Sequence, residues 1–132
     1  MSEENVEIVR RMFELFKRGD VEGVAEFMSD DVLCITSPSQ PDAQVFRGRA
    51  EFVAYGRSWL EVFDEYEVDT TEFLDRGDHV VVVGHVRARG RSSGAVIEDD
   101  DAWLYRLSNG QVVEYRECGT KAQALEAAGL GE

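Results

Sequence analysis

The sequence predicts an α+β domain in which a curved, mostly antiparallel sheet wraps around helices as a cone. Three observations support this fold class. Amphipathic helices are expected near the N-terminus, and most strands follow the helices in the chain. The last third, Asp101 to Leu130, reads as strand, turn, strand and short helix. A strongly bent sheet around a helix leaves a cavity at its open end, the usual place for a ligand.

The helices expected first are Glu3–Arg18 and Val21–Met28. The first helix is expected to have one apolar face, because five apolar residues recur with helical spacing: Val6, Val9, Met12, Phe13 and Phe16. Gly19 is expected to end that helix and Asp20 to cap the next one. Ser29–Asp31 should end the second helix, and the apolar run Val32–Thr36 should form a short strand.

The middle of the chain is predicted as a loop followed by the longest helix. Ser37–Asp42 contains both prolines and several turn formers, so a loop is expected there. Gly48–Phe63 is the predicted helix, with Phe52, Tyr55, Trp59, Leu60 and Phe63 on or near one face. We expect this helix to lie in the concavity of the sheet, with Trp59 buried against Trp103 or Tyr105.

The rest of the chain is predicted as strands joined by tight turns, with one closing helix. The expected strands are Tyr66–Leu74, Val80–Arg89, a strand that begins at Val96, and Gln111–Cys118. The turns are Asp75–Asp78, Gly90–Gly94 and Ser108–Gly110, and the helix is Ala122–Ala128, stopped by Gly129.

Strand alternation predicts which side chains point into the cone. On the strand Val80–Arg89, the apolar set that includes Val80 and Val82 is expected inside. On the next two strands, the inward residues should be Asp101, Trp103, Tyr105, Val113, Tyr115 and Glu117. The outer face would then carry Val81, Val83, Leu104 and Val112, apolar area that a monomer would leave in water. A homodimer through this face is therefore expected.

Composition limits the classes of partner. The net charge of −13 argues against nucleic acid and anionic membranes, both of which need a basic surface. No apolar run approaches the ~18 residues of a membrane span, and the acidic N-terminus is unlike a secretory signal. We therefore expect a cytoplasmic protein with one domain over residues 1–132. Cys34 and Cys118 fit neither a disulfide framework nor a zinc pattern, and ordinary buried thiols are expected.

The order of elements resembles the nuclear-transport-factor-2-like superfamily, and within it the SnoaL-like domains. Arg18-Gly19-Asp20 between the first helices carries part of this resemblance. The other stretches are Ser29–Val32, Phe46–Arg49, Gly90–Gly94, Gly110–Val113 and Ala124–Leu130. The resemblance implies a cone-shaped fold of cystatin-like type and a homodimer. It does not fix an activity, because the superfamily includes isomerases, polyketide cyclases, epoxide hydrolases, dehydratases and non-catalytic binding proteins.

Residue by residue, the resemblance to ketosteroid isomerases fails at the reacting groups. Met12 stands where those enzymes carry a tyrosine on the first helix. Thr36 and Ser37 stand near the position of their general base, and Trp103 near that of their protonated aspartic acid. No Arg–Asp pair on one strand face matches the epoxide hydrolases. Isomerase activity by the family's mechanism is therefore not expected.

Two acids are the candidate catalytic residues. Glu117, if buried beside Tyr115 and Trp103, would be desolvated and could act as a general acid or base. Asp101 would share the cavity and could take the complementary role. The alternatives are a strand-end glutamate that reaches water and, for Glu98–Asp101, a solvated acidic edge. Consecutive strand residues diverge, so a metal site in this run is disfavoured.

Two functional hypotheses stay open. The first is a cofactor-free enzyme that moves a proton next to a carbonyl of a hydrophobic small molecule, as in isomerisation, cyclisation or dehydration. The second is a binding or accessory domain without chemistry. In both, the expected ligand-binding residues are Met12, Phe16, Trp59, Trp103, Tyr105, Val113 and Tyr115. His85 is expected on the outer side, at a subunit contact.

Overall fold

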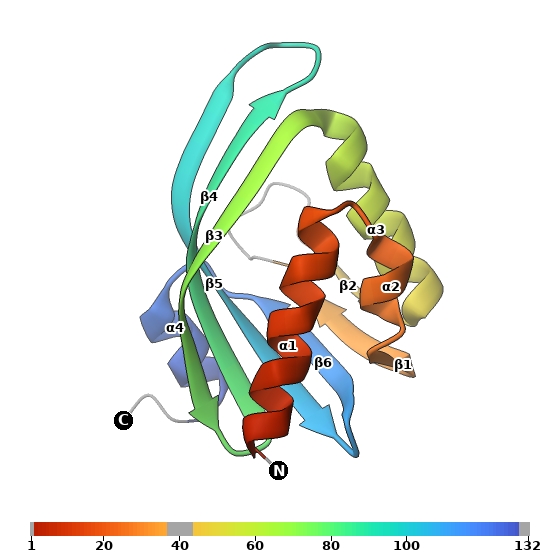
Figure 1. The fold of residues 1–132 in the computed structure, drawn as a ribbon, viewed down its shortest axis with the longest axis vertical. Helices are drawn as coiled ribbons and strands as arrows, with labels where there is room; N and C mark the ends of the chain where they lie inside the picture. The colour runs from red at the N-terminus through yellow and green to blue at the C-terminus, as the bar shows by residue number, and fades with distance from the viewer. Residues whose placement is uncertain (1, 37–43, 130–132) are drawn as a thin grey trace.

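A computed structural model describes residues 2–36 and 44–129, and Figure 1 shows the arrangement of its elements. The loop predicted at Ser37–Asp42 lies outside the described residues. The helices are α1 (Ser2–Lys17), α2 (Val21–Ala25), α3 (Arg49–Val62) and α4 (Lys121–Ala127). The strands are β1 (Met28–Ile35), β2 (Val45–Arg47), β3 (Phe63–Arg76), β4 (His79–Gly90), β5 (Val96–Ser108) and β6 (Gln111–Glu117).

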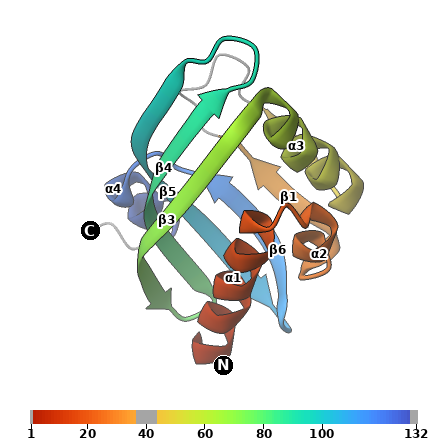
Figure 2. The same ribbon diagram turned by 45° about the horizontal axis from the view of Figure 1, so that its top comes forward.

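The six strands form one curved, open sheet in the order β2-β1-β6-β5-β4-β3. β1 and β6 pair in parallel, and the other neighbouring strands pair antiparallel. Figures 1 and 2 show α1 and α3 on one side of the sheet and α4 on the other. The predicted α+β class, with a bent and mostly antiparallel sheet around helices, is confirmed.

Local sequence signals set the first two helices. Glu3 and Glu4 lie in the first turn of α1, where the helix dipole favours acids. Gly19 follows α1 with φ of 77°, a conformation that glycine adopts without steric cost. The Asp20 carboxylate accepts the backbone N–H of Gly23 at 2.9 Å and caps α2.

The prediction of α2 as Val21–Met28 was too long. α2 ends at Ala25, and β1 begins at Met28, so Ser29–Asp31 lie in the strand. The backbone N–H of Val112 donates to the Phe27 carbonyl at 2.8 Å. This carbonyl is therefore used in pairing with β6, and the helix does not extend to Met28. The short β2 was not predicted.

Both α1 and α3 lie on the concave side of the sheet (Figures 1 and 2), and the Phe52 ring of α3 lies 5.7 Å from the Tyr115 ring between centroids. The helix that packs on Trp103 and Tyr105, however, is α1. The Phe13 ring lies 5.2 Å from the Trp103 ring and 6.0 Å from the Tyr105 ring between centroids. Trp59 of α3 instead contacts Tyr55, Phe63 and Tyr66, so the prediction that it packs on Trp103 or Tyr105 was wrong. α3 packs on α2, where a Cβ added to Gly56 would lie 2.8 Å from a Val21 methyl.

The apolar outer face is covered within one chain. Val81 and Leu104 are 0% and 2% exposed, because they pack with Ala102, Cys118 and Ala124 of α4. Val112 belongs to the main core on the other side of the sheet. The outer sheet face on which the homodimer was predicted is therefore largely covered by α4. The homodimer stays a prediction.

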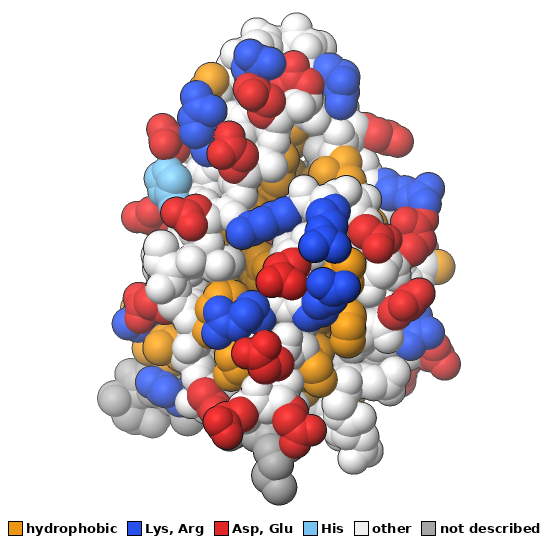
Figure 3. Space-filling model, viewed as in Figure 1, with side chains coloured by type: hydrophobic (Ala, Val, Ile, Leu, Met, Phe, Trp, Pro, Cys, Tyr) orange, Lys and Arg blue, Asp and Glu red, His pale blue; other side chains and the backbone are white. Residues whose placement is uncertain are grey.

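Charges of both signs are spread over the face that carries α1, with hydrophobic side chains visible between them (Figure 3). Among the described residues, no helix is long and apolar enough to cross a bilayer. Both cysteines are free and buried, as expected. Burial raises the pKa of Cys34 to about 12 and that of Cys118 to about 11, so neither thiol is a ready nucleophile.

Candidate functional site

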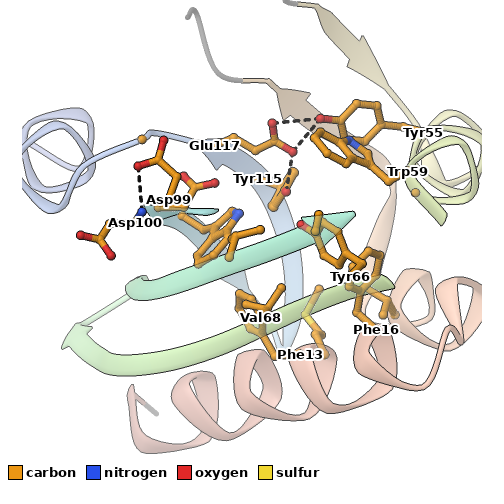
Figure 4. Close-up of a pocket in the computed structure, with 18 of the residues that line it drawn as sticks. Phe13, Phe16, Tyr55, Trp59, Tyr66, Val68, Asp99, Asp100, Tyr115 and Glu117 are labelled. Atoms are coloured by element: carbon orange, nitrogen blue, oxygen red, sulfur yellow. Dashed lines mark hydrogen bonds between the residues drawn. The ribbon is translucent and has the colours of Figure 1, made fainter. Parts of the chain in front are cut away.

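A cavity of about 690 Å³ lies between α1, α3 and the concave side of the sheet. Every helix contributes to its lining, including Val24 of α2 and Gln123 of α4. Eight of the nine predicted site residues line it: Met12, Phe16, Trp59, Asp101, Trp103, Tyr105, Tyr115 and Glu117. Figure 4 shows side chains from α1, α3 and several strands turned toward this space.

Val113 is the exception, because β6 carries a bulge. Arg106 pairs with Glu114 and Leu107 with Val112, so Val113 is an extra residue between two pairs. The bulge puts Val112 in the main core and leaves Val113 out of the cavity lining. The prediction that Val113 points inward with Tyr115 and Glu117 was therefore wrong, whereas both residues beyond the bulge do face the cavity.

Glu117 ends β6 opposite Trp103 and is 9% exposed. The Tyr55 hydroxyl donates to this carboxylate, with distances of 2.9 Å to Oε1 and 2.8 Å to Oε2. The Tyr115 hydroxyl donates to Oε2 at 2.9 Å. Two elements far apart in sequence, α3 and β6, thus hold the carboxylate in place at the cavity wall (Figure 4).

Asp101 lies on β5, two residues before Trp103 and on the same side of the sheet. Burial raises the pKa of Asp101 to about 6, and the negative charge of Glu117 adds to the effect. Backbone hydrogen bonds from Ala102 and Gly119 oppose this shift. A carboxyl that titrates near neutrality can accept or donate a proton in the physiological range.

Aromatic side chains form most of the remaining wall. One group packs around Phe13 and contains Trp103, Tyr105 and Tyr115. A second group lies between α1, α3 and the start of β3 and contains Phe16, Tyr55, Trp59, Phe63 and Tyr66. Such walls suit a planar hydrophobic ligand.

Two buried polar atoms of this wall open into the cavity. Neither the Tyr105 hydroxyl nor the Trp103 indole N–H makes a hydrogen bond to another described residue, and both residues are 5% exposed. In the described chain, every fully enclosed side-chain N or O atom has a hydrogen-bond partner. These two atoms therefore reach the cavity, where a ligand can satisfy them.

Tyr55 and Tyr66 are site residues that sequence reasoning did not select. Tyr55 shares a helical face with Phe52 and Trp59, so its place on the inner side of α3 was readable. Its bond to Glu117 joins residues 62 positions apart, and no local pattern predicts such a contact. Tyr66 was assigned only to a strand. Alternation with the buried Val68 on β3 could have placed it inside.

No described group of three or more His, Cys, Asp and Glu side chains is arranged to hold a metal ion. His85 lies outside the cavity lining, with its ring nitrogens 3.0 Å from Asp100 Oδ1 and 3.0 Å from Glu98 Oε2. The chemistry that the enclosed part of the site offers comes from the carboxyl groups of Asp101 and Glu117, tyrosine hydroxyls and an indole N–H.

Comparison with known families agrees with this architecture. The SnoaL-like domain family matches residues 9–115, and the chain belongs to that family. No match to a curated protein was found.

Solved structures show the same fold. A nuclear-transport-factor-2-like protein from Burkholderia xenovorans LB400 has 28% identity and a TM-score of 0.79, over 96% of this chain and 97% of that chain. A proposed SnoaL-like polyketide cyclase from Jannaschia sp. CCS1 has 25% identity and a TM-score of 0.78, over 98% and 93%. AclR, a proposed hydroxylase from Streptomyces galilaeus, has 18% identity and a TM-score of 0.73, over 98% and 82%, which shows the fold alone.

Proposed function

We propose that the protein binds a hydrophobic small molecule in the cavity and moves a proton next to a carbonyl group of that molecule without a cofactor. The observation that carries this proposal is Asp101, a cavity carboxyl whose pKa burial raises to about 6. In its ionised form Asp101 would take a proton from carbon, and in its neutral form it would return one.

Tyr105 and Trp103 support the carbonyl part of the proposal. Their open hydroxyl and indole N–H can donate to a ligand oxygen as negative charge develops on it. Glu117 lies across from Trp103, where its hydrogen bonds to Tyr55 and Tyr115 keep it in a fixed position. Its charge keeps the pKa of Asp101 up, so it would tune Asp101 or act as the second acid–base group.

One observation favours a second candidate, a non-catalytic binding domain. The Glu117 carboxylate already accepts hydrogen bonds from two tyrosine hydroxyls, as a structural network requires. The relative from Jannaschia is a proposed polyketide cyclase, which supports the catalytic candidate by analogy alone.

Proton exchange in D₂O separates the two candidates. The protein would be mixed with 2-tetralone, a planar hydrophobic ketone, and loss of its C1 proton signals followed by NMR. We expect the protein to accelerate exchange over the rate in buffer. In the Asp101→Asn variant, the protein-catalysed exchange rate should fall by at least ~100-fold. Glu98→Gln is the matched control, since Glu98 lies on the same strand but does not line the cavity. Binding of the ketone without accelerated exchange would establish the binding domain instead.

A further inference from the structure

The cavity has an unbalanced charge. Four acidic residues lie along it: Glu117 is buried and Asp101 is half-buried, whereas Asp99 and Asp100 are exposed, and no Lys, Arg or His is found among the described lining residues. Acids on the outer face of the same sheet are arranged differently. Glu114, for example, lies within 3.4 Å of Arg106 and 2.5 Å of Arg116. The cations of this chain are thus placed away from the cavity.

One of the four acids has a cation outside the cavity. Asp100 Oδ1 lies 3.0 Å from His85 Nδ1, so a protonated His85 offsets its charge. Asp99 and Asp101 make no ion pair with a described residue, and their carboxylates accept hydrogen bonds from the backbone N–H groups of Asp100 and Ala102. Burial strengthens the field of Asp101 in the cavity, because fewer water molecules screen it.

The second aromatic group borders these acids. Trp59 lies 5.8 Å from Tyr66 and 5.2 Å from Phe63 between ring centroids, and Phe16 lies 5.6 Å from Tyr66. Burial raises the pKa of Tyr66, and the charges of Glu117 and Asp101 raise it further. The aromatic rings and the two acids are therefore close enough to interact across the cavity. Aromatic faces attract cations, and several rings around one site hold alkylammonium groups.

The open Tyr105 hydroxyl is evidence for a ligand that does not depend on the acids. This hydroxyl belongs to a residue that is 5% exposed, lacks a described partner and opens to the cavity. A tyrosine hydroxyl can accept a hydrogen bond from an ammonium group as well as donate one to an oxygen. A ligand is therefore expected in this cavity, and the lining determines which charge it can carry.

We propose that the cavity selects a planar hydrophobic ligand that carries a protonated amine, and that it rejects carboxylates and phosphates. The ammonium group would lie against the aromatic rings and the Asp101 carboxylate, where no protein cation competes with it. An anionic ligand would meet like charges in a poorly screened space. This inference rests on the ligand cavity of the proposed function and adds the charge class of its ligand.

Three probes with one ring system test the charge class. Binding of 2-naphthylmethylamine, 2-naphthalenemethanol and 2-naphthoate to the full chain would be measured by calorimetry at pH 7.5. We expect the amine to bind at least ~10-fold more tightly than the alcohol, a difference of about 1.4 kcal/mol. The carboxylate should bind more weakly than the alcohol.

Matched variants separate a local contact from the general negative charge of the protein. Asp101→Asn should weaken amine binding about 10-fold and leave alcohol binding unchanged. Glu98→Gln removes the same charge from a position outside the cavity lining and should leave both affinities unchanged. Equal losses in the two variants would contradict the local contact.

The outcomes distinguish this inference from the proposed function. Equal affinity for the amine and the alcohol would overturn the amine inference and leave the ligand cavity intact. Preference for the carboxylate would overturn it as well. Failure of all three probes to bind would also overturn it, and the exchange assay with 2-tetralone would then decide the proposed function on its own.

Discussion

The two faces of β5 and β6 carry acids with opposite properties. Asp101 faces the cavity, and burial raises its pKa to about 6. Glu114 lies on the outer face, where the hydrogen bond and charge of Arg116 overcome burial and lower its pKa. The strands are the same, so the difference comes from what lies opposite each face. The outer face has arginines, whereas the inner face has aromatic rings and other acids. Of these two acids, the one on the side without cations has the raised pKa, and the one beside arginines has the lowered pKa.

The largest expected effect concerns the apolar part of the outer face. Leu104 is 2% exposed under α4, so Leu104→Ala should lower the free energy of unfolding by about 2–5 kcal/mol. Urea denaturation at two protein concentrations measures this cost. If α4 covers Leu104 within one chain, the cost should not depend on concentration. A cost that appears only where dimers form would show that a partner chain, not α4, buries this face.

The next prediction compares how Asp101 and Glu114 affect the free energy of unfolding. Asp101 has a folded pKa of about 6, raised from 3.8, so its destabilising contribution grows as pH rises from 3.8 to about 6 and is fully present above that. Asp101→Asn should therefore raise the free energy of unfolding at pH 7.5 by about 1–2 kcal/mol, with no gain below pH 3.8.

Glu114 should show the opposite sign. Its pKa is lowered from 4.5, so its stabilising contribution is present above pH 4.5 and is lost as pH falls through the folded value. Glu114→Gln should lower the free energy of unfolding at pH 7.5 by about 1 kcal/mol. Chemical denaturation of both variants across pH checks the pair. Equal signs at pH 7.5 would refute the contrast between the two faces.

A smaller effect is expected from the hydroxyl groups that hold Glu117. Tyr115→Phe removes a buried hydrogen bond to Oε2 and should lower the free energy of unfolding by about 1 kcal/mol. Tyr55→Phe removes a partly buried donor and should cost less. Thermal unfolding of both variants measures the order, and the reverse order would mean that the α3 contact, not the strand contact, fixes this carboxylate.

The smallest effect is expected at His85, which lies near the middle of β4 with a partly exposed side chain. Hydrogen bonds to Asp100 and then Glu98 raise the pKa of His85 above 6.5. Its small stabilising contribution is fully present below pH 6.5 and is lost as pH rises through the folded value. NMR titration of the ring should show this pKa and its decrease in 0.5 M NaCl, because salt screens exposed pairs. A titration at pH 6.5 that salt does not change would show that the acids do not hold the ring.

Much of the fold could be predicted from the sequence, because the spacing of apolar residues along a helix or strand is a property of a short segment. The apolar face of α1, the capping role of Asp20 and the strands Val80–Arg89 and Gln111–Cys118 depend on backbone periods that a short segment displays by itself. Alternation also put Asp101 and Trp103 on one side of β5 correctly, since no irregularity interrupts the pairing there.

The predictions failed where one residue or one distant element decides the outcome. The extra residue Val113 in β6 turns Val112 into the core, and nothing in the run Gln111–Cys118 marks a bulge. The covering of Leu104 depends on where α4 docks. Trp59 had suitable partners on several elements, and aromatic spacing cannot choose between them.

The sequence by itself determined the class of fold, the family resemblance, the net charge and the two acids of the cavity, because composition and periodicity are properties of the chain. Only the tertiary structure decided that α1 packs in the concavity, that α4 covers Leu104, and that Tyr55 holds Glu117 across 62 residues. The elevated pKa of Asp101 belongs to this second group. Burial and the neighbours of a charge arise from packing between remote segments, and many packings are compatible with the same local pattern.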